Sequence, residues 1–207
     1  MLLARASAAS VAGHIALNDA LAQLDARLQR QLERFTARRS GQGFDARPDA
    51  PIVFVCDAGL GGLARWLRAA GYEASWSPDA GDEALLREAR ERGATLLTTD
   101  SELLQRRVIR DGVIPTVWLP PAGHPAEQLA LVFRELRLTP RPPRCMACGG
   151  ELRVVDKAAV AARIPPRTAR WLEEYFVCVR CDRLFWRGTH WQRIQAKLRA
   201  LGVGPGD

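Results

Sequence analysis

The sequence predicts an α/β fold built on a parallel sheet of about four strands flanked by helices. From residue 51 onward, short β-branched apolar runs alternate with helical patterns, and repeated strand–helix units form parallel sheets with right-handed crossovers. A Pro-rich joint at 139–144 then leads into a segment with two Cys-x-x-Cys pairs. We therefore expect three regions: an N-terminal helix and linker (1–50), a sheet domain (51–139) and a zinc ribbon (140–207).

The N-terminal region is predicted to be one amphipathic helix over 14–39, followed by a linker. Its apolar residues recur at steps of three or four, the period of one helix face; they are Leu17, Leu21, Leu24, Leu28, Leu32 and Phe35. This stripe is expected to pack on the sheet domain or on a second copy of the chain. Residues 40–51 combine Gly, Pro and Asp without a period, which is typical of a linker.

Four strands and four helices are predicted in the sheet domain. The strands are 52–56, 72–76, 95–98 and 113–118. The helices that follow them are 60–70, 83–92, 101–110 and 125–136. Ligands of such sheets bind beyond the carboxyl ends of the strands. Functional residues are therefore expected directly after each strand.

The composition indicates a globular protein rather than a disordered or membrane-spanning one. The chain has 207 residues, of which 47% are hydrophobic, enough to bury a sizeable core without disulfides. No apolar run reaches the roughly 18 residues that cross a bilayer, and the first residues lack the apolar core of an export signal. We expect a cytoplasmic protein with no membrane partner.

The net charge of +7 is unevenly distributed along the chain. Residues 51–139 hold 10 basic and 12 acidic residues, whereas residues 140–207 hold 13 basic and 6 acidic residues. The sheet domain is therefore mildly acidic, and the C-terminal segment is the region expected to meet a polyanion.

Four of the five cysteines have the spacing of a structural metal site. They form two Cys-x-x-Cys pairs separated by 29 residues: Cys145 with Cys148, and Cys178 with Cys181. Two such pairs present four thiolates to one tetrahedral Zn²⁺, which leaves no open position for catalysis. A redox pair would instead open a helix after a strand, and the same spacing also admits iron. The fifth cysteine, Cys56, ends an apolar strand and is expected to be buried.

The ribbon is basic and aromatic at the same time. Its basic residues Arg180, Arg183 and Arg187 interleave with Phe185, Trp186 and Trp191. Guanidinium groups bind phosphates and rings stack on bases, so single-stranded nucleic acid is the expected partner. The alternative is that the rings form the ribbon's own core, and at least half of them are expected there.

Two further features of the ribbon are predicted. The long spacer is expected to contain a short helix around 168–175. His190 is expected to have a structural hydrogen-bonding role.

Acidic residues follow three successive strands of the predicted sheet. Asp57 follows the first strand, Asp79 and Asp82 the second, and Asp100 and Glu102 the third. Carboxylates gathered at one edge repel one another unless cations hold them, and Mg²⁺ or Mn²⁺ in such a cluster supports phosphodiester hydrolysis. The alternative is that Asp82 and Asp100 are helix N-caps and Asp79 is a turn residue. Because acidic residues follow three successive strands, we favour a cation-binding catalytic site over separate caps and turns.

A dinucleotide-binding turn is a competing interpretation of the same region. Gly59, Gly61 and Ala64 satisfy the pattern G-x-G-x-x-A after a strand, and Asp79 lies 20 residues beyond Gly59, near the place of a ribose-binding acid. Asp57 would then bring a negative charge beside the pyrophosphate. The sheet domain is also too short to hold a second half or a substrate domain.

Taken together, these motifs resemble the Mut-seven C-terminal ribonuclease family, over roughly residues 52–195. The matching runs are F-V-C-D-A-G-L-G-G-L-A-R-W-L-R-A-A-G-Y (54–72), D-A-G-D-E-A-L-L (79–86), L-L-T-T-D-S-E-L-L (96–104), the two Cys pairs and F-W-R-G-T-H-W (185–191). The resemblance implies a PIN-like nuclease domain joined to a zinc ribbon. Asp57, Asp82 and Asp100 match the acidic motif positions, and Glu83 and Glu102 are nearby acids.

The sequence departs from this family near the first motif. The family usually has Gly-Met before the turn and a Lys within it, where this chain has Ala58-Gly59 and Gly62. The substitution removes a positive charge close to the site, and nothing about residues 1–50 follows from the resemblance. PIN-like nucleases often dimerise, which implies a possible homodimer.

The sequence therefore predicts a Mg²⁺- or Mn²⁺-dependent ribonuclease that acts on single-stranded RNA. Asp57, Asp82 and Asp100 are expected to bind the catalytic ion, assisted by Asp79 or Glu102. Arg65 and Arg68, on the helix after the first strand, are expected to meet substrate phosphates together with the ribbon arginines. The alternatives are a nucleic-acid-binding module without catalysis and a nucleotide-cofactor enzyme.

Overall fold

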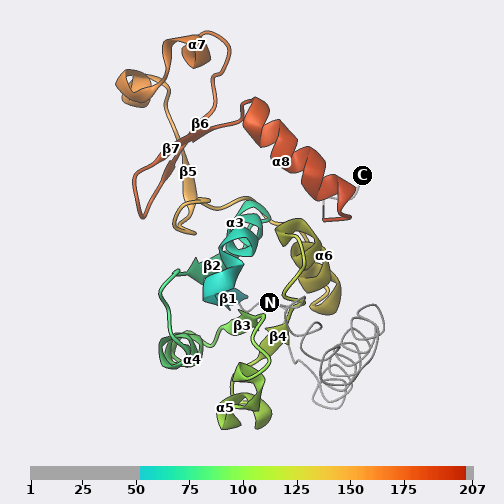
Figure 1. The fold of residues 1–207 in the computed structure, drawn as a ribbon. Coiled ribbons are helices and arrows are strands. Elements are labelled where there is room, and N and C mark those ends of the chain that lie inside the picture. Colours follow the sequence, from blue (N-terminus) through green and yellow to red (C-terminus); the bar gives the residue numbers. More distant parts are fainter. Residues whose placement is uncertain (1–51, 204–207) are drawn as a thin grey trace, which may run out of the picture. The chain divides into compact units, whose positions relative to one another are not determined.

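The computed structural model describes residues 52–203, so the predicted N-terminal helix and linker lie outside it. Four strands form a parallel sheet in the order β2-β1-β3-β4 (Figure 1). They are β1 (Val53–Cys56), β2 (Glu73–Trp76), β3 (Thr95–Thr98) and β4 (Thr116–Trp118). The predicted α/β class and four-stranded parallel sheet are confirmed.

Helices cover both faces of this sheet. Alternate residues of a strand point to opposite faces, and Phe54 and Cys56 accordingly pack in one core while Val55 packs in another. The first core is closed by α3 (Gly61–Ala69) and α6 (Pro125–Glu135), and the second by α4 (Asp82–Glu91) and α5 (Arg107–Arg110). Cys56 is fully buried, as predicted, and burial raises the pKa of its thiol to about 12.

Two predicted elements of the sheet domain are shorter than expected. The predicted helix 101–110 breaks into the 3₁₀ turn η2 (Leu103–Gln105) and the single turn α5, because Arg106 between them has an extended backbone. The predicted strand 113–118 begins only at Thr116, where its pairing with β3 starts opposite Leu96, and the chain before it turns at Gly112, which has a positive φ of 73°. Left-handed backbone of this kind ends regular pairing.

The C-terminal segment contains a second, antiparallel sheet. Its strands β5 (Leu152–Val155), β6 (Tyr175–Cys178) and β7 (Leu184–Trp186) pair in that order. The long spacer forms the 3₁₀ helix η3 (Ala158–Arg163) and the short helix α7 (Pro166–Ala169). The predicted helix around 168–175 is wrong: Pro166 starts the helix earlier, and Tyr175 instead opens β6 opposite Trp186.

The last helix, α8 (Thr189–Ala200), was not predicted. Its residues Ile194 and Leu198, at helical spacing, are buried in the same core as α3 and α6, and the ammonium group of Lys197 lies 5.5 Å from the centre of the Trp66 ring. Contacts therefore cross the predicted boundary between residues 139 and 140. No helix among residues 52–203 is long and apolar enough to cross a membrane.

Candidate functional site

Asp57 follows β1, the strand at which the order of strands in the sheet switches sides. The chain first adds β2 on one side of β1 and then adds β3 and β4 on the other side. Strand β1 has β2 on one side and β3 on the other, so the crevice beyond its carboxyl end is the place where open parallel sheets bind ligands. The backbone N–H of Asp57 donates to the carbonyl of Leu97 at 2.9 Å, which extends the β1–β3 pairing by one residue. This bond fixes the Asp57 carboxylate at the sheet edge.

A buried threonine connects Asp57 to Asp100. The Thr98 hydroxyl, at the end of β3 and fully buried, donates to Asp57 Oδ2 at 2.7 Å and accepts from the Asp100 backbone N–H at 2.9 Å. A hydroxyl group has one donor and two acceptor positions, so this single atom orders both acidic segments. The Asp57 carboxylate and the Asp100 backbone are thus connected by two hydrogen bonds through one Thr98 oxygen.

The turn after Asp57 is packed from inside the protein. Asp57 caps the 3₁₀ turn η1 (Ala58–Leu60), its Oδ1 accepting from the Ala58 N–H at 2.6 Å. The indole N–H of Trp76 donates to the Ala58 carbonyl at 2.9 Å. A methyl group added at Gly61 would lie 2.6 Å from the Trp76 ring. Glycine is required here for close packing against that ring.

This packing removes the main support for a dinucleotide-binding turn. In that motif the second glycine lets the backbone approach the pyrophosphate, and Gly61 would hold that position. The Trp76 indole occupies the space beside Gly61 instead. Gly62 is likewise close to a neighbour, because a methyl group there would lie 2.6 Å from the Pro125 ring. The glycines serve internal packing.

The remaining predicted acids are exposed and follow β2 and β3. Asp79 lies in the exposed turn after β2, and Asp82 is the first residue of α4, whose N-cap is Gly81. Asp82 is therefore not the N-cap considered above. Asp100 does have a local structural role, since its Oδ1 accepts from the Glu102 N–H at 2.7 Å. Glu102 itself is exposed.

These acids are not brought into one tight cluster. Within residues 52–203, the group of three or more His, Cys, Asp or Glu ligands that meets within 4.8 Å consists of cysteines. No Lys or Arg of this range forms an ion pair with the five predicted acids, whereas the neighbouring Glu83 is bound by Arg106. The sheet edge thus carries carboxylates without a protein counter-charge, a donor set of hard oxygens that suits a divalent cation.

The four ribbon cysteines form two knuckles with the same backbone pattern. In the first, the Cys145 N–H donates to the Gly150 carbonyl at 2.8 Å and the Gly149 N–H donates to the Cys145 carbonyl at 2.8 Å. In the second, the Cys178 N–H donates to the Arg183 carbonyl at 3.0 Å and the Asp182 N–H donates to the Cys178 carbonyl at 2.9 Å. The fourth residue after each leading cysteine has positive φ: 77° at Gly149 and 55° at Asp182.

The sulfur atoms fit a tetrahedral metal ion. The Cys145 and Cys181 sulfurs lie 3.6 Å apart, and the Cys148 and Cys178 sulfurs 3.4 Å apart. Four thiolates at about 2.3 Å from one Zn²⁺ would be about 3.8 Å from one another. A methyl group at Gly150 would lie 2.8 Å from the Cys178 sulfur, so a side chain there would enter the metal cluster. The four cysteines therefore fit structural zinc.

The environment of the cysteines differs across the cluster. Burial raises the pKa of the Cys145 thiol to about 12. Burial acts in the same direction on Cys178, but hydrogen bonds from the Cys181 and Arg180 N–H groups and from neighbouring thiols lower its pKa to about 7. Zinc binds the thiolate form, and the N–H groups aimed at Cys178 stabilise that form.

Arg68 does not face substrate, which corrects its predicted role. Its side chain is 6% exposed, and its guanidinium donates to the carbonyls of Ala74, Met146 and Ala147 at 2.8, 3.1 and 2.9 Å. A buried guanidinium must satisfy its donors inside the protein. Arg68 does so by tying α3 to the first zinc knuckle.

Arg180 has a related structural role at the second knuckle. Its guanidinium donates to the Cys148 carbonyl at 2.9 Å and to Glu73 Oε1 at 2.7 Å. Glu73, the first residue of β2, also pairs with Arg92 at 2.9 Å and Arg144 at 3.7 Å. Burial alone would raise the pKa of Glu73, but the bond from Arg180 and the three positive charges outweigh it and lower the pKa.

The other predicted nucleic-acid contacts remain accessible. Arg65, Arg183 and Arg187 are exposed. Phe185, Trp186 and Trp191 are partly buried, and of these only Trp186 packs against the ribbon's core cluster. The expectation that at least half of these rings form the core is therefore wrong.

His190 is exposed in the first turn of α8, and its side chain makes no hydrogen bond within residues 52–203, contrary to the predicted structural role.

Comparison with known proteins places this arrangement in a family. The family model of the Mut7-C RNAse domain matches residues 52–198. That range includes the parallel sheet, both knuckles and most of α8. No curated protein and no solved structure matches the chain.

Proposed function

This chain belongs to the Mut7-C RNAse domain family, and we propose that it is a divalent-cation-dependent ribonuclease that hydrolyses single-stranded RNA. Its active site is the carboxyl edge of the parallel sheet around Asp57. Asp100 lies on the neighbouring strand, and Asp82, Asp79 and Glu102 complete the acidic surroundings. The zinc ribbon holds the RNA.

The observation that carries this proposal is the Thr98 hydroxyl held between Asp57 and Asp100. A general turn or cap does not need a fully buried hydroxyl to connect two acidic segments on adjacent strands. Asp57 keeps free lone pairs on both oxygens after accepting these bonds, and Asp100 keeps one oxygen free of hydrogen bonds within residues 52–203. These bonds and the remaining lone pairs support a cation site between the ends of strands β1 and β3.

Mg²⁺ or Mn²⁺ at this edge would be held by Asp57, Asp100 and Asp82, and would supply charge stabilisation and an acidified water. In the reaction, a water oxygen bonds to phosphorus and the bond from phosphorus to the 3′ oxygen breaks. The released 3′ oxygen takes up a proton, so the products carry a 5′ phosphate and a 3′ hydroxyl. Asp79 or Glu102 would assist by binding or orienting the water.

The arrangement of charge explains why the ribbon accompanies the sheet. The acidic edge repels RNA phosphates in the absence of a cation, whereas residues 140–207 carry 13 basic against 6 acidic residues. Arg183 and Arg187 lie on the ribbon, and Arg65 lies on α3, which starts beside Asp57. The cationic surface thus supplies affinity and the acidic edge supplies chemistry.

Cleavage of labelled single-stranded RNA with Mg²⁺ or Mn²⁺ tests the proposal. Asp57→Asn and Asp100→Asn should each lower the cleavage rate by at least about 100-fold, because each removes a cation ligand while keeping the shape of the side chain. Asp111→Asn is the matched control, since that acid pairs with Arg107 before β4. Unchanged cleavage in both site variants would refute the site. Metal-independent RNA binding without any cleavage would favour a binding module.

A further inference from the structure

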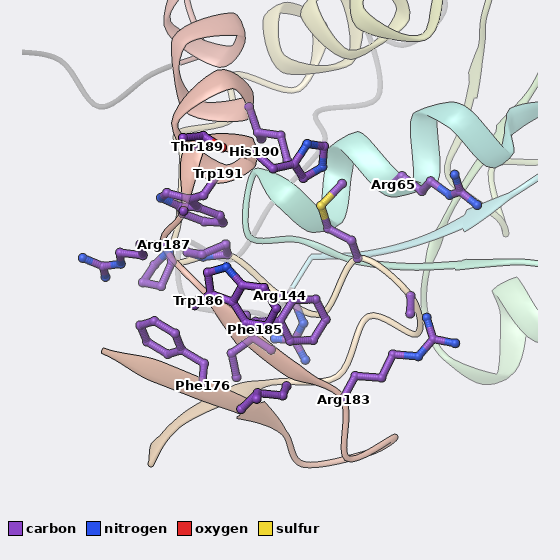
Figure 2. Close-up of a pocket in the computed structure, with 18 residues that line it drawn as sticks. Arg65, Arg144, Phe176, Arg183, Phe185, Trp186, Arg187, Thr189, His190 and Trp191 are labelled. Carbon is purple, nitrogen blue, oxygen red and sulfur yellow. The ribbon is translucent and has the colours of Figure 1, made fainter. Parts of the chain in front are cut away.

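A cavity of about 680 Å³ lies beside the ribbon (Figure 2). Its walls come from α3, the segment leading into and forming the first knuckle, strands β5 to β7 and the first turns of α8. Pockets of roughly 300–1,000 Å³ hold small organic groups. This cavity therefore has room for an unpaired nucleotide, and it is separate from the carboxylates at the sheet edge.

The floor of the cavity is an aromatic sheet face. Phe176 and Phe185 are direct cross-strand partners on β6 and β7, so their rings lie on the same face of the sheet. Both rings are partly buried and remain accessible. The opposite face of the same strands holds Tyr175 and Val177, which form the ribbon's core. Leu184 and Trp186 contact that core and also line the cavity, whereas Phe176 and Phe185 lie outside the core cluster.

The rim of the cavity is positively charged. None of its 18 lining residues is an Asp or Glu, and four are Arg. The guanidinium groups of Arg65 and Arg183 have no hydrogen bond or ion pair within the part of the chain that the structure describes, and both extend to the same side of the ring cluster in Figure 2. Arg187 lies on the other side, with its guanidinium carbon 5.4 Å from the centre of the Phe176 ring.

We propose that this cavity binds one or two unpaired nucleotides of the RNA, their bases stacking on Phe185 and Phe176 and their phosphates meeting Arg65 and Arg183. The identification of the polymer as RNA rests on the proposed function. Flat rings with nearby guanidinium groups are the combination that binds single strands without sequence preference. A base paired in a duplex has no exposed face to stack, so the cavity selects single-stranded segments.

The position of Arg65 connects this subsite with the cutting edge. Helix α3 begins at Gly61, directly after the turn capped by Asp57. Arg65 lies four residues further, about 6 Å along the helix axis. A strand anchored in the cavity therefore meets Arg65 between the aromatic floor and the Asp57 edge. An apolar peptide would satisfy the rings but would leave the two guanidinium groups without a partner.

Binding of a five-nucleotide uridine RNA tests the subsite in the full-length zinc-loaded protein. The background is Asp57→Asn without added Mg²⁺ or Mn²⁺, so that the probe stays intact. Phe185→Leu keeps an apolar side chain but removes the ring and should weaken binding about 5- to 100-fold. Phe185→Trp keeps a stacking surface and should restore it. Zinc content and melting temperature check that each variant folds.

Arg183→Gln tests the cationic rim with a matched control on the same ribbon. It should weaken binding and lower the slope of log affinity against log salt by about 0.7, one phosphate contact for a single strand. The control Arg153→Gln removes the same charge from β5, where Arg153 pairs with Val177 and so lies on the face away from Phe185. Its affinity and salt slope should stay close to those of the background protein.

The outcomes separate this inference from the proposed function. If Phe185→Leu binds the RNA as tightly as the background while wild-type cleavage depends on Asp57, the subsite is wrong and the nuclease assignment stands. If binding depends on Phe185 and Arg183 but no cleavage occurs with either metal, the subsite stands and the nuclease assignment falls. Equal losses in Arg153→Gln and Arg183→Gln would also overturn the subsite, since charge alone would then explain binding.

Discussion

The Thr98 hydroxyl donates to Asp57 Oδ2 at 2.7 Å, from the end of one strand to the end of its neighbour. Thr98 is fully buried, and its oxygen also accepts from the Asp100 backbone. This one side chain therefore sets the relative position of two acidic segments that are 43 residues apart in the sequence. Its contribution to the site can be tested separately from its contribution to the fold.

Thr98→Val should lower RNA cleavage by roughly 10- to 100-fold, because small displacements of a catalytic group have effects of that size. The substitution keeps the shape of the side chain and removes its hydrogen bonds. Thr95→Val is the control, since Thr95 is a buried threonine at the other end of β3. Thr98→Ser should recover most of the activity. Full activity in Thr98→Val would show that the hydroxyl does not order the site.

Gly150→Ala should reduce zinc affinity and stability together. The added methyl group would lie 2.8 Å from the Cys178 sulfur, and wild-type protein should contain one zinc per chain because four thiolates satisfy its tetrahedral coordination. Metal analysis and thermal unfolding measure both effects. Gly81→Ala is the control, because a methyl group there meets no atom within 4 Å. Equal zinc content in the two variants would count against the described knuckle geometry.

Glu73 should make stability depend on pH in the acidic range. Its pKa is lower in the folded protein than its ordinary value of 4.5, so its contribution is present above pH 4.5 and is lost as the pH falls through the folded pKa. Glu73→Gln should reduce the free energy of unfolding by about 1–3 kcal/mol at neutral pH, the size of hydrogen bonds to charged groups.

The difference between wild type and Glu73→Gln should shrink as the solution is acidified. Denaturant unfolding of both proteins from pH 7 to pH 3 measures it. Glu91→Gln, on the exposed end of α4, controls for the loss of a negative charge. A difference that stays constant over this range would contradict the assigned ion pairs with Arg92, Arg144 and Arg180.

Leu198→Ala should destabilise the whole of residues 52–203 rather than α8 alone. Leu198 is 2% exposed in the core shared with α3 and α6, and such truncations cost about 2–5 kcal/mol. Chemical denaturation followed by tryptophan fluorescence should show one shifted transition. The exposed neighbour substitution Arg199→Ala should leave it nearly unchanged. A separate early transition in Leu198→Ala would mean that the ribbon and sheet unfold independently.

Local patterns in the sequence determined the parallel sheet, the acidic residues after three strands and the four cysteines that fit a zinc site. Strand periodicity and Cys spacing are properties of a few neighbouring residues. The structure accordingly contains the parallel sheet and brings the four cysteines together. The predicted helix around 168–175 failed because Tyr175 pairs with Val155 and Trp186, and such pairing across the sheet is invisible to local helix propensity. Helix α8 was locally visible in the spacing of Trp191, Ile194 and Leu198, but its burial against α3 was not.

Tertiary structure alone decided what each arginine and each ring does. Arg65 and Arg68 are one helical turn apart and look equivalent in the sequence, yet Arg68 is buried against three carbonyls and Arg65 is exposed at the cavity. Phe185 and Trp186 are adjacent and both line the cavity, yet only Trp186 also packs against the ribbon's core cluster. Composition fixes which groups are available, and burial against distant segments determines which of them can reach a ligand.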